Sequence, residues 1–124
     1  MNAVDKALRD AMAIDGALGA ALVDLESGMA LGTRSAAPDL DLSLAAAGHT
    51  DIIRAARRTL AATDLVTEVI EDILTTLSTQ YHLLRPLTRT GGAGLSLSLV
   101  LDRTRANLAM ARHQLRRIET ELDV

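Results

Sequence analysis

Every second residue from 95 to 101 is leucine, and this alternation constrains the fold more than any other feature of the chain. In an extended strand the four leucines point to one side, while Ser96, Ser98 and Val100 point to the other. The leucine side must be covered by other apolar groups. The alternation therefore predicts a β-strand with a hydrophobic layer packed against it.

Other segments supply the rest of a sheet. Residues 18–25 are apolar in both alternate sets, which is typical of an interior strand covered on both faces. The triplet Glu26-Ser27-Gly28 predicts a hairpin turn into a short edge strand over residues 29–33. Residues 66–76 and 80–87 predict two more strands, with their turn at Ser78 and Thr79. Connections this short make the last three strands consecutive and antiparallel.

Three helices are predicted from apolar residues at three- and four-residue spacing, over residues 4–12, over 42–62 and towards 122. Asp39 and Asp41 supply helix-start chemistry for the second helix, and Asp102 is the predicted N-cap of the third. Glu119 and Glu121 are expected in a solvated ladder with nearby arginines. The order is helix, two strands, helix, three strands, helix, so we expect one α/β domain over residues 1–124.

Composition disfavours several classes of protein. The absence of cysteine excludes disulfides and thiolate metal sites, and a net charge of −3 gives no drive towards nucleic acid. Tyr81 is the only aromatic residue, so a pocket that stacks a planar cofactor is disfavoured, and we expect no cofactor. The chain shows neither a secretion-signal pattern nor an apolar run of roughly 20 residues. We therefore expect a cytoplasmic protein that is not inserted in a membrane.

Two motifs that could indicate a binding site have simpler interpretations. Gly91-Gly92-Ala93-Gly94 precedes a strand and lacks the Lys-Ser/Thr pair of a phosphate-binding loop, so a hairpin is favoured. His49, His82 and His113 lie in separate elements without metal-ligand spacing, so we expect no metal. His49 falls on the apolar stripe of the middle helix. A buried or interfacial neutral imidazole, hydrogen-bonded to backbone, is favoured there over a pH sensor.

Charged residues give two candidate binding regions. Arg54, Arg57 and Arg58 lie on one turn of the middle helix, as a solvated face or as a patch that docks on a partner. Glu68 and Asp72 share a face of the predicted strand 66–76. They either protect an edge strand from indiscriminate pairing or select a partner across a dimer seam. The predicted dimer interface is Val66, Glu68, Val69, Ile70, Asp72 and Ile52.

Several short strings, in this order along the chain, resemble the roadblock family, the relatives of the dynein roadblock light chain. They are GALGAALV at residues 16–23, LESG at 25–28, HLLRPL at 82–87, LVLDR at 99–103 and ANLA at 106–109. The resemblance spans nearly the whole chain. It implies a profilin-like, roadblock α/β fold with an antiparallel sheet in the order 2-1-5-4-3, the first and last helices on one face and the middle helix on the other.

The same resemblance implies a function. Roadblock proteins form homodimers in which third strands meet edge to edge and middle helices pair, and bacterial members often act with a small Ras-like GTPase. We therefore expect a homodimeric, non-catalytic adaptor or regulator of such a GTPase in bacterial signalling or polarity. The arginines would dock onto residues 64–72 of a second subunit or onto the GTPase. The alternative is a small sensory or ligand-binding module without a GTPase partner. No residues lie at a spacing that would support an enzyme.

Overall fold

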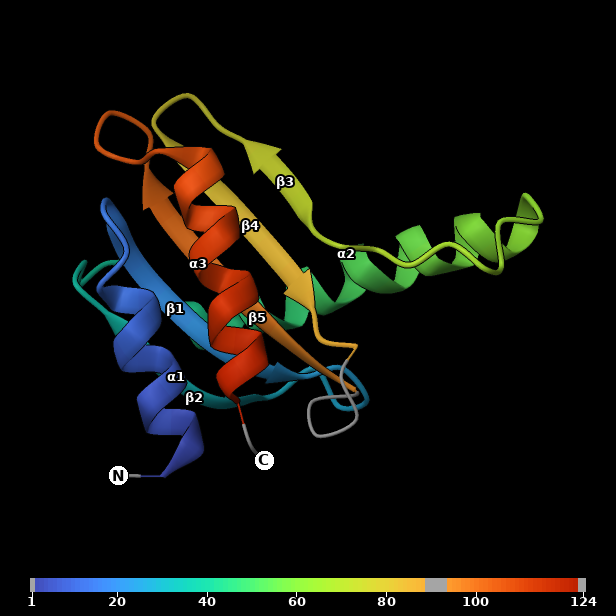
Figure 1. Ribbon diagram of the computed structural model, residues 1–124, viewed down its shortest axis with the longest axis horizontal. Helices are drawn as coiled ribbons and strands as arrows, with labels where there is room; N and C mark the ends of the chain where they lie inside the picture. The colour runs from blue at the N-terminus through green and yellow to red at the C-terminus, as the bar shows by residue number, and fades with distance from the viewer. Residues whose placement is uncertain (1, 89–93, 123–124) are drawn as a thin grey trace.

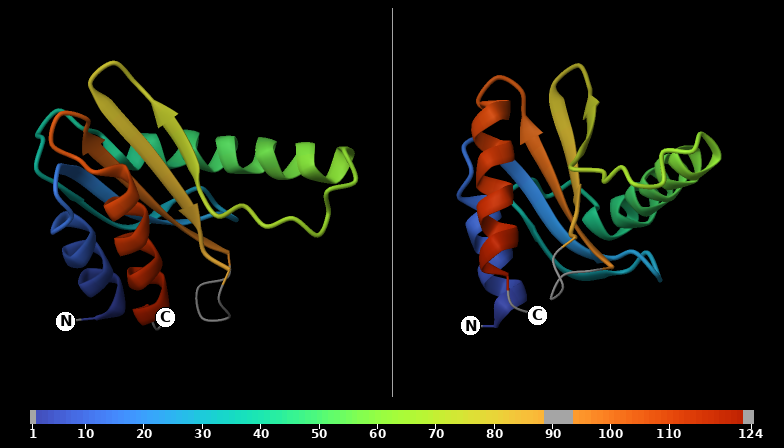
Figure 2. Two further views of the ribbon diagram at one scale, coloured as in Figure 1. Left: turned by 45° about the horizontal axis from the view of Figure 1, so that its top comes forward. Right: turned by 45° about the vertical axis from the view of Figure 1, so that its right-hand side comes forward.

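The computed structural model describes residues 2–88 and 94–122. Its elements are α1 (Ala3–Met12), β1 (Ala17–Asp24), β2 (Ala30–Ser35), α2 (Leu42–Ala62), β3 (Ile73–Thr76), β4 (Gln80–Pro86), β5 (Leu95–Asp102) and α3 (Leu108–Glu121). The strands form one antiparallel sheet in the order β2-β1-β5-β4-β3. Helices α1 and α3 cover one face and α2 crosses the other (Figures 1 and 2). The predicted α/β class, strand order and layer arrangement are confirmed.

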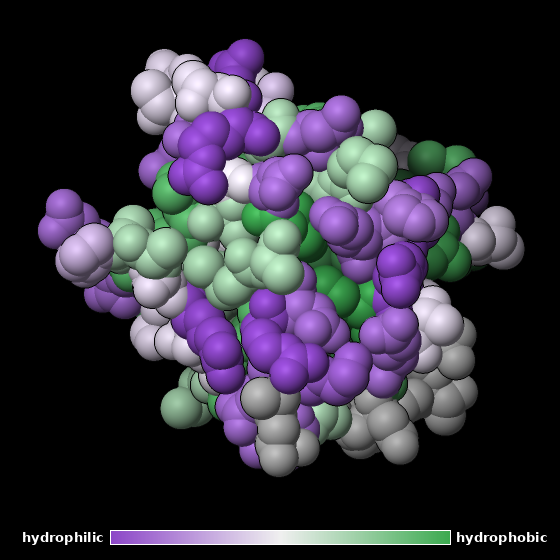
Figure 3. Space-filling view, turned by 60° about the vertical axis from the view of Figure 1, so that its left-hand side comes forward, coloured by the Kyte–Doolittle hydropathy of each residue, from purple (hydrophilic) through white to green (hydrophobic). Residues whose placement is uncertain are grey.

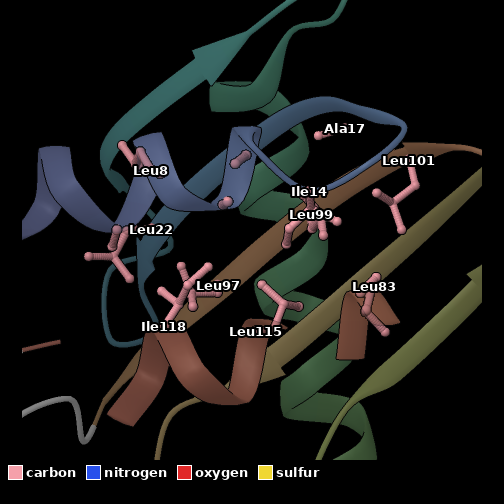
Figure 4. Packing of buried hydrophobic residues seen from close by; sticks show 14 of the residues in the cluster. Leu8, Ile14, Ala17, Leu22, Leu83, Leu97, Leu99, Leu101, Leu115 and Ile118 are labelled. Atoms are coloured by element: carbon pink, nitrogen blue, oxygen red, sulfur yellow. The ribbon is translucent and has the colours of Figure 1, made fainter. Parts of the chain in front are cut away.

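The main core lies between the sheet and the pair α1 and α3 (Figure 4). Leu97, Leu99 and Leu101 of the central strand β5 are buried there with Leu8 of α1 and Leu115 of α3, as the leucine alternation predicts. The opposite face of β5 carries the polar Ser96 and Ser98 and lies under α2. Two small clusters, around Ala46 and around Ile53, join α2 to the sheet. The hydrophobic core on the α2 side of the sheet is therefore smaller than the core on the side of α1 and α3.

One predicted helix cap is confirmed and another is wrong. Asp41 caps α2, because its Oδ1 accepts from Leu44 N at 3.0 Å. Asp102 does not cap α3: it still pairs with Gln80 at the end of β5, so the chain must leave the sheet before it can turn into a helix. Asn107 caps α3 through Met110 N at 3.0 Å. Gly28, with φ of +78°, confirms the hairpin turn between β1 and β2.

Strand β3 is shorter than predicted, and this is the main correction to the expected fold. It begins at Ile73 rather than at residue 66, so Glu68 and Asp72 do not share a strand face. Ile73 pairs with Leu84, and in that register residue 71 would face Pro86, which has no N–H to donate. The ladder therefore ends at Ile73. Residues 91–93 of the predicted glycine hairpin lie outside the described residues, while Gly94 has φ of +87°.

Candidate functional site

The second half of α2 and the segment after it form an arm that extends beyond the sheet. The buried residues of α2 all lie between Leu42 and Ile53. Past Ile53 the helix runs on beyond the sheet, and residues 63–72 return beside it to β3 (Figures 1 and 2). None of residues 54–72, which we call the arm, is buried. The arm therefore has no core of its own.

The arm nevertheless presents large apolar side chains to solvent. Val66 is 72% exposed and Val69 is 61% exposed, and Leu65 and the neighbouring Ile52 of α2 are also exposed. Exposed apolar residues are ordinary when scattered, but a cluster of them on one projecting segment is typical of an interaction surface. A different face, seen from the side of α1, carries hydrophilic and hydrophobic residues intermixed (Figure 3). The arm is therefore a candidate interaction surface.

A groove of about 900 Å³ opens between the arm, the start of β3 and α3. Apolar groups line much of it, among them Leu60, Val69, Ile70 and Ile73. Arg112 and Arg116 of α3 form the opposite wall. The groove has no aromatic residue in its lining, and it suits an apolar segment with charged neighbours better than a planar ligand.

One ion pair joins the base of the arm to α3, and a second, between β4 and α3, reaches the arm through a backbone carbonyl. Arg112 donates to both carboxylate oxygens of Asp72, from Nε at 2.9 Å and from Nη2 at 3.1 Å. Arg85 donates through Nε to Glu119 Oε1 at 2.9 Å and through Nη1 to the carbonyl oxygen of Glu71 at 3.3 Å. Bidentate contacts of this kind hold direction as well as position. The arm therefore leaves the domain at a fixed point.

Glu119 is a residue whose role sequence reasoning missed. Instead of joining a solvated ladder, its side chain is buried and its Oε2 accepts from Thr88 N at 2.8 Å. A signal was present, because Glu119 lies four residues after Leu115 and so falls on the edge of the apolar stripe of α3. Its partners could not be predicted from the neighbouring residues, since Arg85 is 34 residues away along the chain.

The three predicted docking arginines separate into two kinds. Arg54 Nη2 donates to the carbonyl oxygens of Leu25 at 2.7 Å and of Glu26 at 2.6 Å, so it holds the β1–β2 hairpin against α2. Arg57 and Arg58 are exposed, and neither forms an ion pair with any residue that the structure describes. Only these two remain available for a partner.

The predicted interface residues are brought together in part. Val66, Glu68 and Val69 are exposed on the returning segment, and Ile70 lines the groove beside them. Asp72 lies next to them but is held by Arg112. Ile52 lies on α2 just before the arm, with its side chain exposed.

Two of the three histidines, His49 and His82, lie against each other in the structure. His49 is 8% exposed, and its Nδ1 lies 3.2 Å from Ser98 Oγ, a side-chain rather than a backbone partner. Its ring meets that of His82 edge to face, with centroids 5.6 Å apart. Burial, and then the neighbouring His82, lowers the pKa of His49 to about 4. Over residues 2–88 and 94–122, no three His, Cys, Asp or Glu side chains gather as a metal site would require.

Ser98 and His49 are a serine and an imidazole in contact, but both are buried between α2 and the sheet, where a substrate has no access. In the described parts of the chain, no helix has the length and apolar character to cross a bilayer.

No protein-family model matches the chain, and no curated protein does either. Solved structures do. A Roadblock/LC7 domain from Streptomyces avermitilis superposes with a TM-score of 0.78 at 14% identity, over 94% of this chain and 91% of that one. The gliding protein MglB from Thermus thermophilus gives 0.70 at 23% identity, over 96% and 90%. MglB from Myxococcus xanthus gives 0.72 at 16% identity, over 97% and 88%.

These structures superpose on nearly the whole chain. The likeness covers nearly all of this protein and of each relative, so the comparison concerns complete domains rather than a common fragment. The chain has the Roadblock/LC7 fold.

Proposed function

We propose that this protein is a homodimeric, non-catalytic adaptor or regulator of a small Ras-like GTPase in bacterial signalling or polarity, acting in the cytoplasm as a single domain. The observation that carries the proposal is the arm: a segment of 19 residues, 54–72, that buries none of its side chains and exposes Val66 and Val69. Such a segment is stabilised when a partner covers it.

A second copy of the chain fits this surface. Strand β3 is at the border of the sheet, and the arm extends from that border, so a two-fold axis there would bring β3 against β3 and arm against arm. Arg57 and Arg58 on the helical part of the arm would meet the acidic residues of the partner's returning segment. Charges of opposite sign on one patch make it complementary to its own copy and set its orientation.

The comparisons support the regulatory part of the proposal. One of the similar structures is described as a gliding protein and another as MglB with a tetrameric arrangement, which shows association for that protein. The GTPase partner is proposed from the resemblance of the sequence to the roadblock family. Where the second copy does not contact Arg57 and Arg58, these two arginines offer the GTPase a cationic docking point.

Sedimentation of the wild-type chain and two variants tests the dimer. Val69→Lys places a charge in the centre of the apolar part of the arm, so we expect the wild type to sediment as a dimer at micromolar concentration and this variant as a monomer. Met110→Lys is the matched control, because Met110 is also an exposed apolar residue, at 52%, but lies on α3. A monomeric wild type, or an equal effect of both substitutions, would contradict the dimer.

The GTPase part has its own test. The purified protein is mixed with the Ras-like GTPase of the same organism, loaded with a non-hydrolysable GTP analogue. We expect a complex, or a changed rate of GTP hydrolysis when GTP replaces the analogue. If neither occurs while the chain still forms dimers, the GTPase assignment is wrong and the self-association stands.

A further inference from the structure

Few contacts hold α2 on the sheet, and a pair of histidines lies among them. The buried side chains of α2 are Leu42, Ala46, His49, Thr50 and Ile53. Thr50 Oγ1 donates to Ala46 O within the helix, so His49 is the buried polar group that reaches the sheet, through Ser98. The attachment of α2 to the sheet therefore rests on this small patch and on the hydrogen bonds of Arg54 to the β1–β2 hairpin.

His82 of β4 completes the pair from the sheet side. Its Nε2 lies 2.9 Å from Gln80 Oε1, which accepts and so places the proton on Nε2. The rings of His49 and His82 meet at an angle of 76° with centroids 5.6 Å apart. Burial lowers the pKa of His82 as well. The two imidazoles are thus packed against each other in a site that suits them when neutral.

The elements around the pair offer it no counter-charge. On the α2 side of the sheet, the strand residues nearest the pair are uncharged. Ala21 of β1 is paired with Ser98, Thr75 of β3 is paired with His82, and Thr33 of β2 is paired with Ala21. The carboxylate of Asp102, at the end of β5, accepts instead from Thr104 N and Oγ1. On α2, Asp51 is exposed and Arg54 is bound to the β1–β2 hairpin. Neither ring forms an ion pair with any described carboxylate, so a proton gained there stays uncompensated.

We propose that the His49–His82 pair is a proton-sensitive catch between α2 and the sheet, which loosens α2 and its arm when the surroundings become acidic. Protonation of either ring places a charge without a counter-charge between α2 and the sheet, and protonation of both sets two like charges against each other. Release of the helix relieves both costs. The consequence for partner binding rests on the proposed function, because the arm is its docking surface, whereas the motion of α2 does not.

The absence of cysteine allows the motion to be measured with two spin labels. Ala62→Cys at the end of α2 and Ala109→Cys on α3 introduce exposed attachment points. Labelled chains are diluted tenfold with unlabelled protein, so that only distances within one chain are recorded. We expect one narrow distance distribution at pH 7.5 and a distinctly broader one at pH 5.0.

Variants decide whether the histidines cause the change. His49→Gln with His82→Gln keeps hydrogen-bonding groups but removes the titration, so the distribution should be the same at both pH values. His113→Gln on α3 is the control and should behave like the wild type, because His113 is exposed. Should the double variant fail to fold, NMR titration of the wild-type rings decides: His49 titrating near 6.5 would overturn the proposal, as would an unchanged wild-type distribution at pH 5.0 or a change that persists in the double variant. The recorded distances lie within one chain, in a monomer and in a dimer alike.

Discussion

Replacement of Glu119 by glutamine should destabilise the fold far more than its helical surface position suggests. Glu119 is 5% exposed, and its Oε1 lies 2.8 Å from Nη2 of Arg85, whose own side chain is 13% exposed. Removal of one partner from a buried ion pair costs about 3–5 kcal/mol, because the other charge stays buried without compensation. Glutamine keeps the shape and can still accept from Thr88 N, so we expect about 3 kcal/mol, the lower end of that range.

The assay is urea unfolding followed by circular dichroism, with linear extrapolation to water. Glu121→Gln is the matched control in the same helix: Glu121 is 47% exposed in its pair with Lys6, and solvent screens an exposed pair. The double variant Arg85→Met with Glu119→Leu should lose less than Glu119→Gln alone, since it leaves no unpaired charge. A loss below about 1 kcal/mol for Glu119→Gln, or a loss equal to that of Glu121→Gln, would refute the reasoning.

Two further predictions follow from single residues. Because the pKa of His49 is lowered to about 4 from 6.5, the unfolded chain takes up a proton first as the pH falls, so stability present above pH 6.5 is lost towards pH 4. Between pH 7.5 and 5.0 we expect the free energy of unfolding to fall by about 2 kcal/mol from His49, checked by urea unfolding at each pH; an unchanged value in the wild type would contradict this. Gly16→Ala should cost on the order of 1–3 kcal/mol, because Gly16 has φ of +85° and a Cβ would lie 2.9 Å from Ala106 N. Gly48→Ala in α2, with nothing within 4 Å, should raise the melting temperature slightly, and a larger loss there than at Gly16 would count against the argument.

The sheet could be predicted from the sequence because its signals are local. The leucine alternation from 95 to 101 places β5, and the Gly28 turn places the first hairpin. Helix periodicity gives α2 its observed start and end. The strand order came from the family resemblance rather than from periodicity, since no local pattern states which strands are neighbours.

The rest depended on contacts that the linear pattern does not contain. Residues 66–70 are rich in β-branched side chains, yet they form the returning segment of the arm, because Pro86 ends the ladder that would have extended β3. Arg54 was grouped with Arg57 and Arg58, although its hydrogen bonds reach back to the β1–β2 hairpin. The α3 cap was readable, since Asn107 directly precedes the apolar stripe, but Asp102 offered an equally good capping side chain earlier.

The strand order also determines when the protein can fold. The central strand, β5, is the last to be made, and its register joins Leu101 to Ala17 at the other end of the chain. Until β5 leaves the ribosome, the β1–β2 and β3–β4 hairpins have no common neighbour, and each exposes an unpaired edge. Pairings this distant in sequence slow folding. A nascent chain of this protein must therefore wait for residues 95–102, and truncation before residue 95 would leave two separate hairpins in place of a sheet.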